Sequence, residues 1–295
     1  MKKYILIALL TACSVNMLPG SVMPWNQATS PAEIALSGAV LSMISEPQGL
    51  SVNPALLSGV KWRGVNSSGV LWPLDIYGGS VSGVLPAAKA GVLAAGISYW
   101  NYGLLNAYDR LGSQLGTINP QAVSALLGFG RKLYSGLSGG INLKGSMSSI
   151  GSNKDYSWAS DLALCYDFKY LSANVQLRDA GPRYPVNDSL KHDLLKTFSA
   201  GIKKTFFREQ LAICLQADAV ETQKWHPLLG LEYSPLKALT LRLGYDGDDA
   251  KPERSKFGLG FCFKQTGKQD YTVEYGYRSW GQLGTVQAIS LGMSF

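Results

Sequence analysis

Charged residues are scarce in this sequence: only 16% of its 295 residues are Asp, Glu, Lys or Arg, whereas 46% are hydrophobic. Beyond the N-terminus, however, no stretch contains the ~18 apolar residues that a membrane-spanning helix needs, which excludes a helical membrane protein. Histidine is also rare, and neither His192 nor His226 stands in a pattern that supplies a nucleophile and an orienting acid. The sequence therefore predicts no catalytic site, and we expect a protein that is not an enzyme.

The charged residues that are present do not form a binding motif. Asp246, Asp248, Asp249 and Glu253 stand close together, but acidic turns are usually solvated, and Asp246-Gly247 is itself a turn signal. The net charge of +7 would suggest nucleic acid as a partner in a cytosolic chain, yet the Lys and Arg residues are scattered without a continuous patch. We therefore predict no metal, no cofactor and no nucleic-acid partner.

Alternation of apolar and polar residues dominates the second half of the chain. In 171–178 the odd positions are apolar and the even positions are polar, and the same period recurs in 239–246, 256–264, 271–278 and 287–295. A period of two is typical of β-strands whose two faces meet different surroundings. In a membrane barrel, the apolar face meets lipid and the polar face meets the lumen. A soluble β-sandwich also alternates, but its exposed face should contain more charge than these strands do.

The alternating segments divide into about fourteen strands, an even number as bacterial single-chain barrels require. They lie near residues 58–67, 72–85, 89–102, 121–134, 136–147, 156–168, 169–178, 195–206, 208–219, 225–233, 236–246, 254–265, 269–279 and 284–295. Short turns alternate with longer polar links, and the short turns should be periplasmic and the long loops extracellular. The sequence therefore predicts an all-β fold, a transmembrane antiparallel outer-membrane β-barrel formed by residues 58–295.

The N-terminus predicts export. Two lysines precede an apolar run that is too short for a membrane span and fits a secretory signal peptide, which we place at residues 1–21. Residues 10–13 resemble a lipobox, which would make Cys13 the lipidated first residue of the mature protein. The alternative is ordinary cleavage near Gly20 or Ser21, in which case Cys13 is discarded. In both cases we expect the protein in the bacterial outer membrane.

One helix is predicted between the signal peptide and the barrel. Ser30, Pro31 and Glu33 fit a capping box with proline at the first helical position, and the helix should continue to about Ile44. An apolar helix in front of a barrel must be buried, so we expect residues 22–57 to form a short helical plug in the lumen. The alternative is a periplasmic helix that lies on the membrane surface.

Several charged residues fall on the polar phase of the predicted strands and would point into the lumen. They are Lys144, Asp161, Arg178, Glu232, Arg242, Glu274 and Arg278. Because a buried charge is costly unless it is paired, we expect these residues to form a network, with Glu232, Arg242 and Glu274 in a ladder across neighbouring strands. The network either fills a narrow lumen or lines a gate.

A series of different short motifs follows a definite order along the chain. They are Asn53-Pro54-Ala55-Leu56 after the predicted helix, then 140–144, 161–164, 230–233, 241–245 and 257–260, and finally Leu291, Met293 and Phe295 on one face of the last strand. This ordered set resembles the PorV/PorQ family, a UPF0164-type group of outer-membrane proteins with a barrel similar to that of FadL, the long-chain fatty-acid transporter. Leu56 stands where that family usually has glycine. The terminal Phe295 resembles the C-terminal signal for barrel insertion.

The resemblance implies one of two functions. PorV-like members bind cargo released by the type IX secretion channel and pass it to surface attachment machinery, whereas FadL-like members move hydrophobic molecules across the outer membrane past an N-terminal hatch. We favour the cargo-binding role and keep transport as the alternative, with a purely structural or partner barrel as a third class. The expected partners are outer-membrane lipid, the barrel-insertion machinery, and either secreted cargo or secretion-system subunits or a hydrophobic small molecule.

Overall fold

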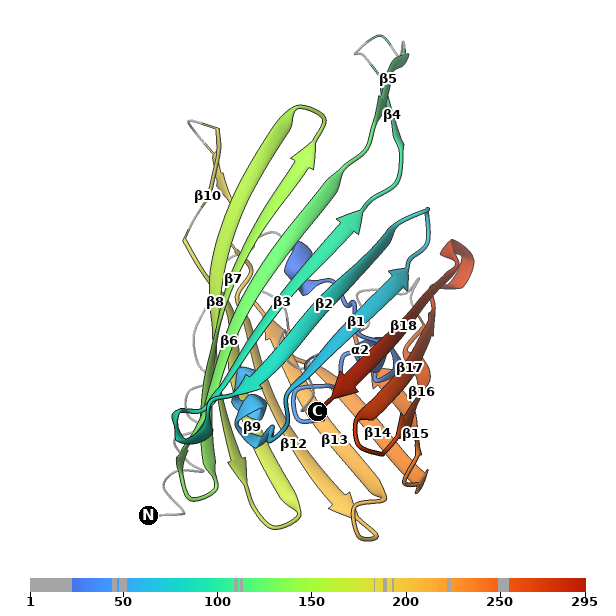
Figure 1. Ribbon diagram of the computed structural model, residues 1–295. Coiled ribbons are helices and arrows are strands. Elements are labelled where there is room, and N and C mark those ends of the chain that lie inside the picture. Colours follow the sequence, from blue (N-terminus) through green and yellow to red (C-terminus); the bar gives the residue numbers. More distant parts are fainter. Residues whose placement is uncertain are drawn as a thin grey trace.

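Fourteen antiparallel strands close into a barrel in the computed structural model of the chain (Figure 1). The structure describes residues 23–43, 47, 52–108, 111, 114–182, 184–187, 190–192, 194–221, 224–248 and 255–295. The predicted signal peptide and Cys13 lie outside these residues. The predicted fold class, a fourteen-stranded antiparallel barrel with a short N-terminal helix inside it, is confirmed.

Each predicted strand corresponds to one barrel strand. The barrel strands are β1 (Gly64–Leu71), β2 (Tyr77–Pro86), β3 (Val92–Asn101), β6 (Gln121–Tyr134), β7 (Leu137–Ile150), β8 (Asn153–Asp167), β9 (Leu171–Ala180), β12 (Thr197–Phe206), β13 (Leu211–Val220), β14 (His226–Leu236), β15 (Leu239–Asp246), β16 (Phe257–Gln265), β17 (Asp270–Ser279) and β18 (Thr285–Ser294). Pairing of β1 with β18, in register from Gly64 opposite Ser294, closes the barrel.

The predicted inward and outward phases are those of the structure. Leu241 and Leu243 on β15, like Phe257 and Phe261 on β16, point outward and are exposed on the barrel surface. The residues between them face the lumen. On β9 the same alternation buries Asn174 and Gln176 inside, each 2% exposed. An outer face made of large apolar side chains is what a barrel surrounded by lipid requires.

Short turns join the strands at the end of the barrel where β1 begins and β18 ends. Two of the longer links at the opposite end contain hairpins of their own, β4 (Leu105–Tyr108) with β5 (Gln114–Ile118) and β10 (Tyr184–Asn187) with β11 (Leu190–His192). The β4–β5 hairpin rises above the barrel rim (Figure 1). The sequence predicted these segments only as polar links. Two single-turn 3₁₀ helices, η4 (Ala88–Ala90) and η5 (Gly281–Leu283), lie in other connections.

The prediction that the first strand starts at residue 58 is wrong. A 3₁₀ helix, η3 (Pro54–Gly59), occupies this position, and the strand begins six residues later. Val60, an apolar residue of the predicted strand, is used inside the barrel instead, where it packs with Leu57 against Val84 and Val92 on the lumenal face.

The predicted helix is much shorter than expected. Among the residues that the structure describes, two helices precede η3, namely η1 (Pro24–Asn26) and α2 (Pro31–Ala35). The helix α2 ends where Ser37 and Gly38 adopt positive φ angles of 53° and 91°. The N-cap residue Ser30 makes no side-chain capping hydrogen bond, so the predicted capping box is absent. Among the described residues, no helix is long and apolar enough to cross a membrane.

Candidate functional site: the plug and the lumenal wall

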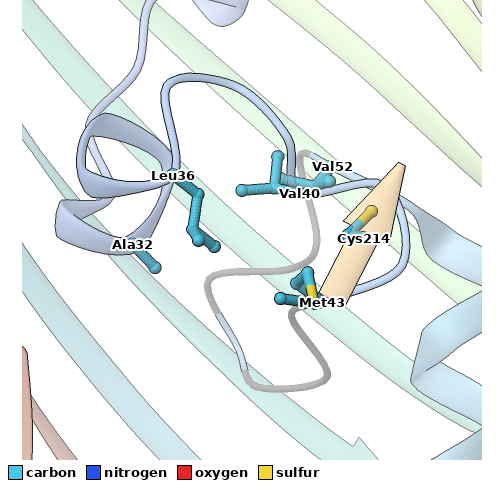
Figure 2. Packing of buried hydrophobic residues seen from close by; sticks show 6 residues of the cluster. All are labelled: Ala32, Leu36, Val40, Met43, Val52 and Cys214. Atoms are coloured by element: carbon cyan, nitrogen blue, oxygen red, sulfur yellow. The ribbon is translucent and has the colours of Figure 1, made fainter. Parts of the chain in front are cut away.

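The segment before β1 lies inside the barrel and packs against its inner wall, and we call the described residues 23–43 and 52–60 the plug. Its apolar side chains are deeply buried: Ala35, Leu36 and Ala39 are each 0% exposed. One cluster joins Ala32, Leu36, Val40, Met43 and Val52 to Cys214 on β13, and Figure 2 shows the plug side chains gathered beside that strand. The expected position of the plug in the lumen therefore agrees with its packing against inward-facing residues.

Asn53, from the predicted plug motif, holds two parts of the plug and the wall together. Its side-chain oxygen accepts a hydrogen bond from the backbone N–H of Ala55 and so caps η3. Its amide nitrogen donates to the Leu41 carbonyl at 2.8 Å and to the Asn174 side chain of β9 at 3.0 Å. Asn174 in turn donates to the Ser42 hydroxyl at 2.9 Å. Pro54 and Ala55 of the motif are buried, and Leu56 is half-buried.

Glycines on the inner face of the wall let the plug backbone approach closely. A Cβ atom at Gly244 would lie 1.9 Å from the carbonyl carbon of Leu36, and one at Gly140 would lie 2.3 Å from that of Pro54. In both cases the atom that the added Cβ would meet belongs to the plug backbone, which cannot move aside as a flexible side chain does. The wall and the plug are therefore shaped to each other, and larger residues at these glycines are incompatible with the observed seating.

The predicted ladder of Glu232, Arg242 and Glu274 has direct contacts. Arg242 donates from Nε to Glu232 Oε1 at 2.7 Å and from Nη1 to Glu274 Oε1 at 2.9 Å. Ser290 on β18 donates to the other oxygen of Glu274 at 3.2 Å. Planar guanidinium donors suit this arrangement, because one side chain can bridge carboxylates on β14 and β17.

Lys144 and Asp161 belong to a second buried cluster. Lys144 Nζ lies 2.7 Å from Asp161 Oδ1 and also contacts Asp179, whose carboxylate accepts hydrogen bonds from Trp25 at 2.8 Å and Asn26 at 2.6 Å. The cluster therefore ties η1 of the plug to β7, β8 and β9. Asp179 is not among the predicted site residues, because the sequence prediction places it directly after the strand at 169–178, at the start of a polar link.

A β-bulge explains the inward position of Asp179. The pairing of β8 with β9 shifts between Ser160 and Leu162, and Asp179 has a φ of 63°, which is uncommon for a residue other than glycine. Its backbone N–H donates to Asp161 Oδ1 at 3.0 Å. No signal in the sequence marks this irregularity.

The remaining predicted charges pair elsewhere on the wall. Arg178 lies 3.5 Å from Asp218, and Arg278 donates to Asp246 at 3.0 Å. The structure thus distributes the seven predicted residues over separate pairs and clusters, and it adds Asp179, Asp218 and Asp246.

Arg178 also contributes electrostatically to Glu33 of α2. Burial raises the pKa of the Glu33 carboxyl from 4.5 to about 7, and the positive charge of Arg178 opposes that rise.

Two cavities are lined by residues that precede β1 together with residues of the barrel wall. One, of about 60 Å³, is lined by Trp25, Thr29 and Leu126 and by serine hydroxyls of β1, β2, β3 and β6, without a charged side chain. The other, of about 240 Å³, lies near the short-turn end between Asn66, Thr272 and Ser294. Pro47 contributes to the lining of both cavities.

The other predicted sites lie apart from the lumen. Leu291 and Phe295 are 60% and 57% exposed on the outer face, with Met293 half-buried beside them. The backbone of Phe295 exchanges two hydrogen bonds with Arg63, which extends the seam that closes the barrel. In the part of the chain that the structure describes, no three His, Cys, Asp or Glu side chains are arranged to hold a metal ion. Asp249 and Glu253 of the acidic cluster lie outside that part.

Comparison with solved structures places the fold among outer-membrane transporters. The toluene transporter TodX of Pseudomonas putida matches with a TM-score of 0.63 at 12% identity, covering 95% of this chain and 98% of that one. TbuX, the toluene transporter of Ralstonia pickettii, gives 0.61 at 10% identity over 90% and 96%. A FadL homologue of Pseudomonas aeruginosa gives 0.58 at 10% identity over 96% and 99%.

Sequence comparisons add no family. No family model matches the chain, and no curated protein matches it. At identities of 10–12% the structural likeness shows the fold alone. The chain therefore has a FadL-like outer-membrane β-barrel fold with an N-terminal plug, and the resemblance to the PorV/PorQ group in particular receives no support from these structures.

Proposed function

We propose that this protein is an outer-membrane channel that admits small hydrophobic molecules past its internal plug. The observation that carries the proposal is the match to toluene transporters and a FadL homologue over nearly the whole of both chains, combined with cavities beside a seated plug. The cargo-binding role that we favoured from the sequence has no comparable support, so transport replaces it as the first candidate.

Passage requires the plug to move. The cavity lined by Trp25 and serine hydroxyls has a volume of about 60 Å³, which is well below the ~300 Å³ of typical ligand pockets. Its lining is uncharged, which suits a neutral molecule with a largely apolar body. Hydrogen bonds from Trp25 and Asn26 to Asp179 and from Asn53 to Asn174 tie the plug to the wall, and the glycines let it sit close. Displacement of the plug would therefore widen the space in the lumen without opening the barrel wall.

A disulfide that locks the plug provides a direct test. Ser42 of the plug hydrogen-bonds to the thiol of Cys214, so the substitution Ser42→Cys places two thiols side by side without altering the wall. In cells that lack other transporters of this fold, uptake of labelled toluene and of a labelled long-chain fatty acid would be measured with and without oxidant. We expect uptake above the empty-vector level, its loss when the disulfide forms, and its recovery after reduction.

The outcomes separate the functions. The oxidised wild-type protein, which has Ser42, controls for effects of the oxidant. Equal uptake by the locked and reduced variants, with the disulfide verified by mass spectrometry, would contradict passage past a moving plug. No uptake of either probe would contradict transport altogether. Stoichiometric capture of secreted proteins or attachment-machinery subunits with the native protein would then support the cargo-binding role.

A further inference from the structure

A large apolar groove crosses the outer face of the barrel, on the opposite side of the wall from the plug. It has a volume of about 630 Å³ and runs over β6, β7, β8, β9 and β12. Five adjacent strands at a spacing of roughly 4.8 Å give it a length of about 19 Å. A groove of this size on a lipid-facing surface is filled by lipid whenever the protein is in a membrane.

Two neighbouring cross-strand rows of side chains form the groove. The first row consists of Arg131, Gly139, Leu164 and Val175, which are paired in register. The second consists of Phe129, Ile141, Leu162, Leu177 and Phe198. The floor is low at Gly139, because this outward-facing position has no side chain. Apart from Arg131, the outward-facing side chains of both rows are therefore apolar.

Arg131 is the single charged residue among the residues that line this groove. It lies on the outward phase of β6, three residues before the end of the strand, close to the short turn that leads into β7. Its side chain is exposed, and its guanidinium makes no ion pair or hydrogen bond with a described residue. A cation at this level of a membrane barrel meets the phosphates of lipid head groups.

We propose that this groove is a binding site for a phospholipid of the surrounding bilayer, with one acyl chain in the groove and the phosphate at Arg131. The apolar rows bind the acyl chain by burying its apolar surface. The guanidinium of Arg131 binds the phosphate through charge-assisted hydrogen bonds. The short-turn end of the barrel, where Arg131 lies, is the end that we expect to face the periplasm. The site does not depend on transport through the lumen.

Native mass spectrometry of the full-length protein tests the site. The protein would be equilibrated with vesicles of phosphatidylethanolamine and phosphatidylglycerol, transferred to mild detergent, and examined for retained lipid. We expect one phospholipid per wild-type barrel. Arg131→Gln should reduce retention about tenfold, because a charge-assisted hydrogen bond is worth roughly 1.5 kcal/mol or more. Gly139→Leu should reduce it similarly by filling the groove, since a Cβ there already approaches Leu133 to 2.8 Å.

Two matched variants control for non-specific effects. Arg63→Gln removes an exposed arginine that lies just before β1, at the same end of the barrel and outside the groove. Gly145→Leu adds the same side chain to the same strand, where the nearest atom to a Cβ is 3.8 Å away. Both should retain lipid as the wild type does, and heat modifiability verifies that all four variants form barrels. Equal retention by the groove variants and their controls overturns the proposal, and loss with Arg131→Gln alone overturns the acyl-chain site.

Discussion

Asn53 in the plug and Asn174 on β9 are 121 residues apart in the sequence, yet the amide nitrogen of Asn53 donates a 3.0 Å hydrogen bond to the amide oxygen of Asn174. Both side chains are buried, at 0% and 2% exposed. Asn53 also binds the Leu41 carbonyl and the Ala55 N–H. One side chain therefore connects the two halves of the plug to the wall. We call Asn53 the latch, meaning the residue whose hydrogen bonds hold the plug in its seated position.

Replacing Asn53 with leucine should loosen the plug while the barrel stays closed. The substitution keeps the volume but leaves the Leu41 carbonyl and the Ala55 N–H without their partner, which costs about 1–3 kcal/mol for each buried group. Hydrogen exchange followed by mass spectrometry should show faster exchange in 31–43 and 54–59, with the strands unchanged. Asn106→Leu, in the exposed β4–β5 hairpin, serves as the control. Equal exchange in the two variants would contradict the latch.

Gly244→Ala should unseat the plug through a steric conflict. The added methyl group would lie 1.9 Å from the backbone of Leu36, whereas a methyl group at Gly69 meets nothing within 4 Å. In planar bilayers, Gly244→Ala should therefore increase ion conductance several-fold over the wild type, and Gly69→Ala should leave it unchanged. If both variants conduct like the wild type, the plug does not close the lumen.

The barrel itself was predictable because its signal is local. In each barrel strand, as in 239–246, apolar and polar residues alternate, and this alternation identifies the two faces of the strand without reference to its neighbours. The same alternation identified which charged residues point into the lumen. The structure places Arg242 between Glu232 and Glu274, although the role of that ladder stays a proposal.

The departures from prediction have non-local causes. Residues around Val60 are as apolar as a strand, but they pack inside against β2 and β3, which the local pattern does not reveal. The helix α2 ends early because Ser37 and Gly38 turn the chain where the wall comes close at Gly244. Asp179 enters the lumen through a bulge that shifts the alternation by one residue. Each of these features depends on the fit between plug and wall.

Seating of the plug should weaken as the pH rises. Burial raises the pKa of Glu33 in the seated plug from 4.5 to about 7, so the seated state binds a proton more tightly than the released state. The associated stabilisation is complete below about pH 4.5 and is lost as the pH rises through 7. Hydrogen exchange in α2, corrected for its intrinsic pH dependence, should accelerate between pH 5 and pH 8.

The variant Glu33→Gln isolates this effect because it removes the titrating group and keeps the shape. Its corrected exchange should be nearly independent of pH over that range. Glu209→Gln, in the exposed turn between β12 and β13, should retain the wild-type dependence. A Glu33→Gln protein that follows the wild-type curve would mean that another group controls the seating.

Removing Lys144 should destabilise the protein far more than removing a lysine from an exposed pair. Lys144 is 4% exposed and pairs with Asp161 and Asp179, which are 0% and 1% exposed. Lys144→Met would leave two buried carboxylates without their cation, at a cost of about 3–5 kcal/mol. Lys264→Met breaks a pair with Asp270 in which the lysine side chain is 41% exposed, and should cost less than about 1 kcal/mol.

Urea unfolding in lipid vesicles, followed by tryptophan fluorescence, measures both effects under the same conditions. A second substitution, Asp179→Asn, should restore part of the stability lost in Lys144→Met, because it removes one of the two unpaired charges while the amide oxygen still accepts from Trp25. Near-additive losses in the double variant, or equal losses for Lys144→Met and Lys264→Met, would show that the cluster contributes through packing instead of charge pairing. The double variant therefore decides whether the bulge at Asp179 exists to complete a buried ion cluster that anchors the plug.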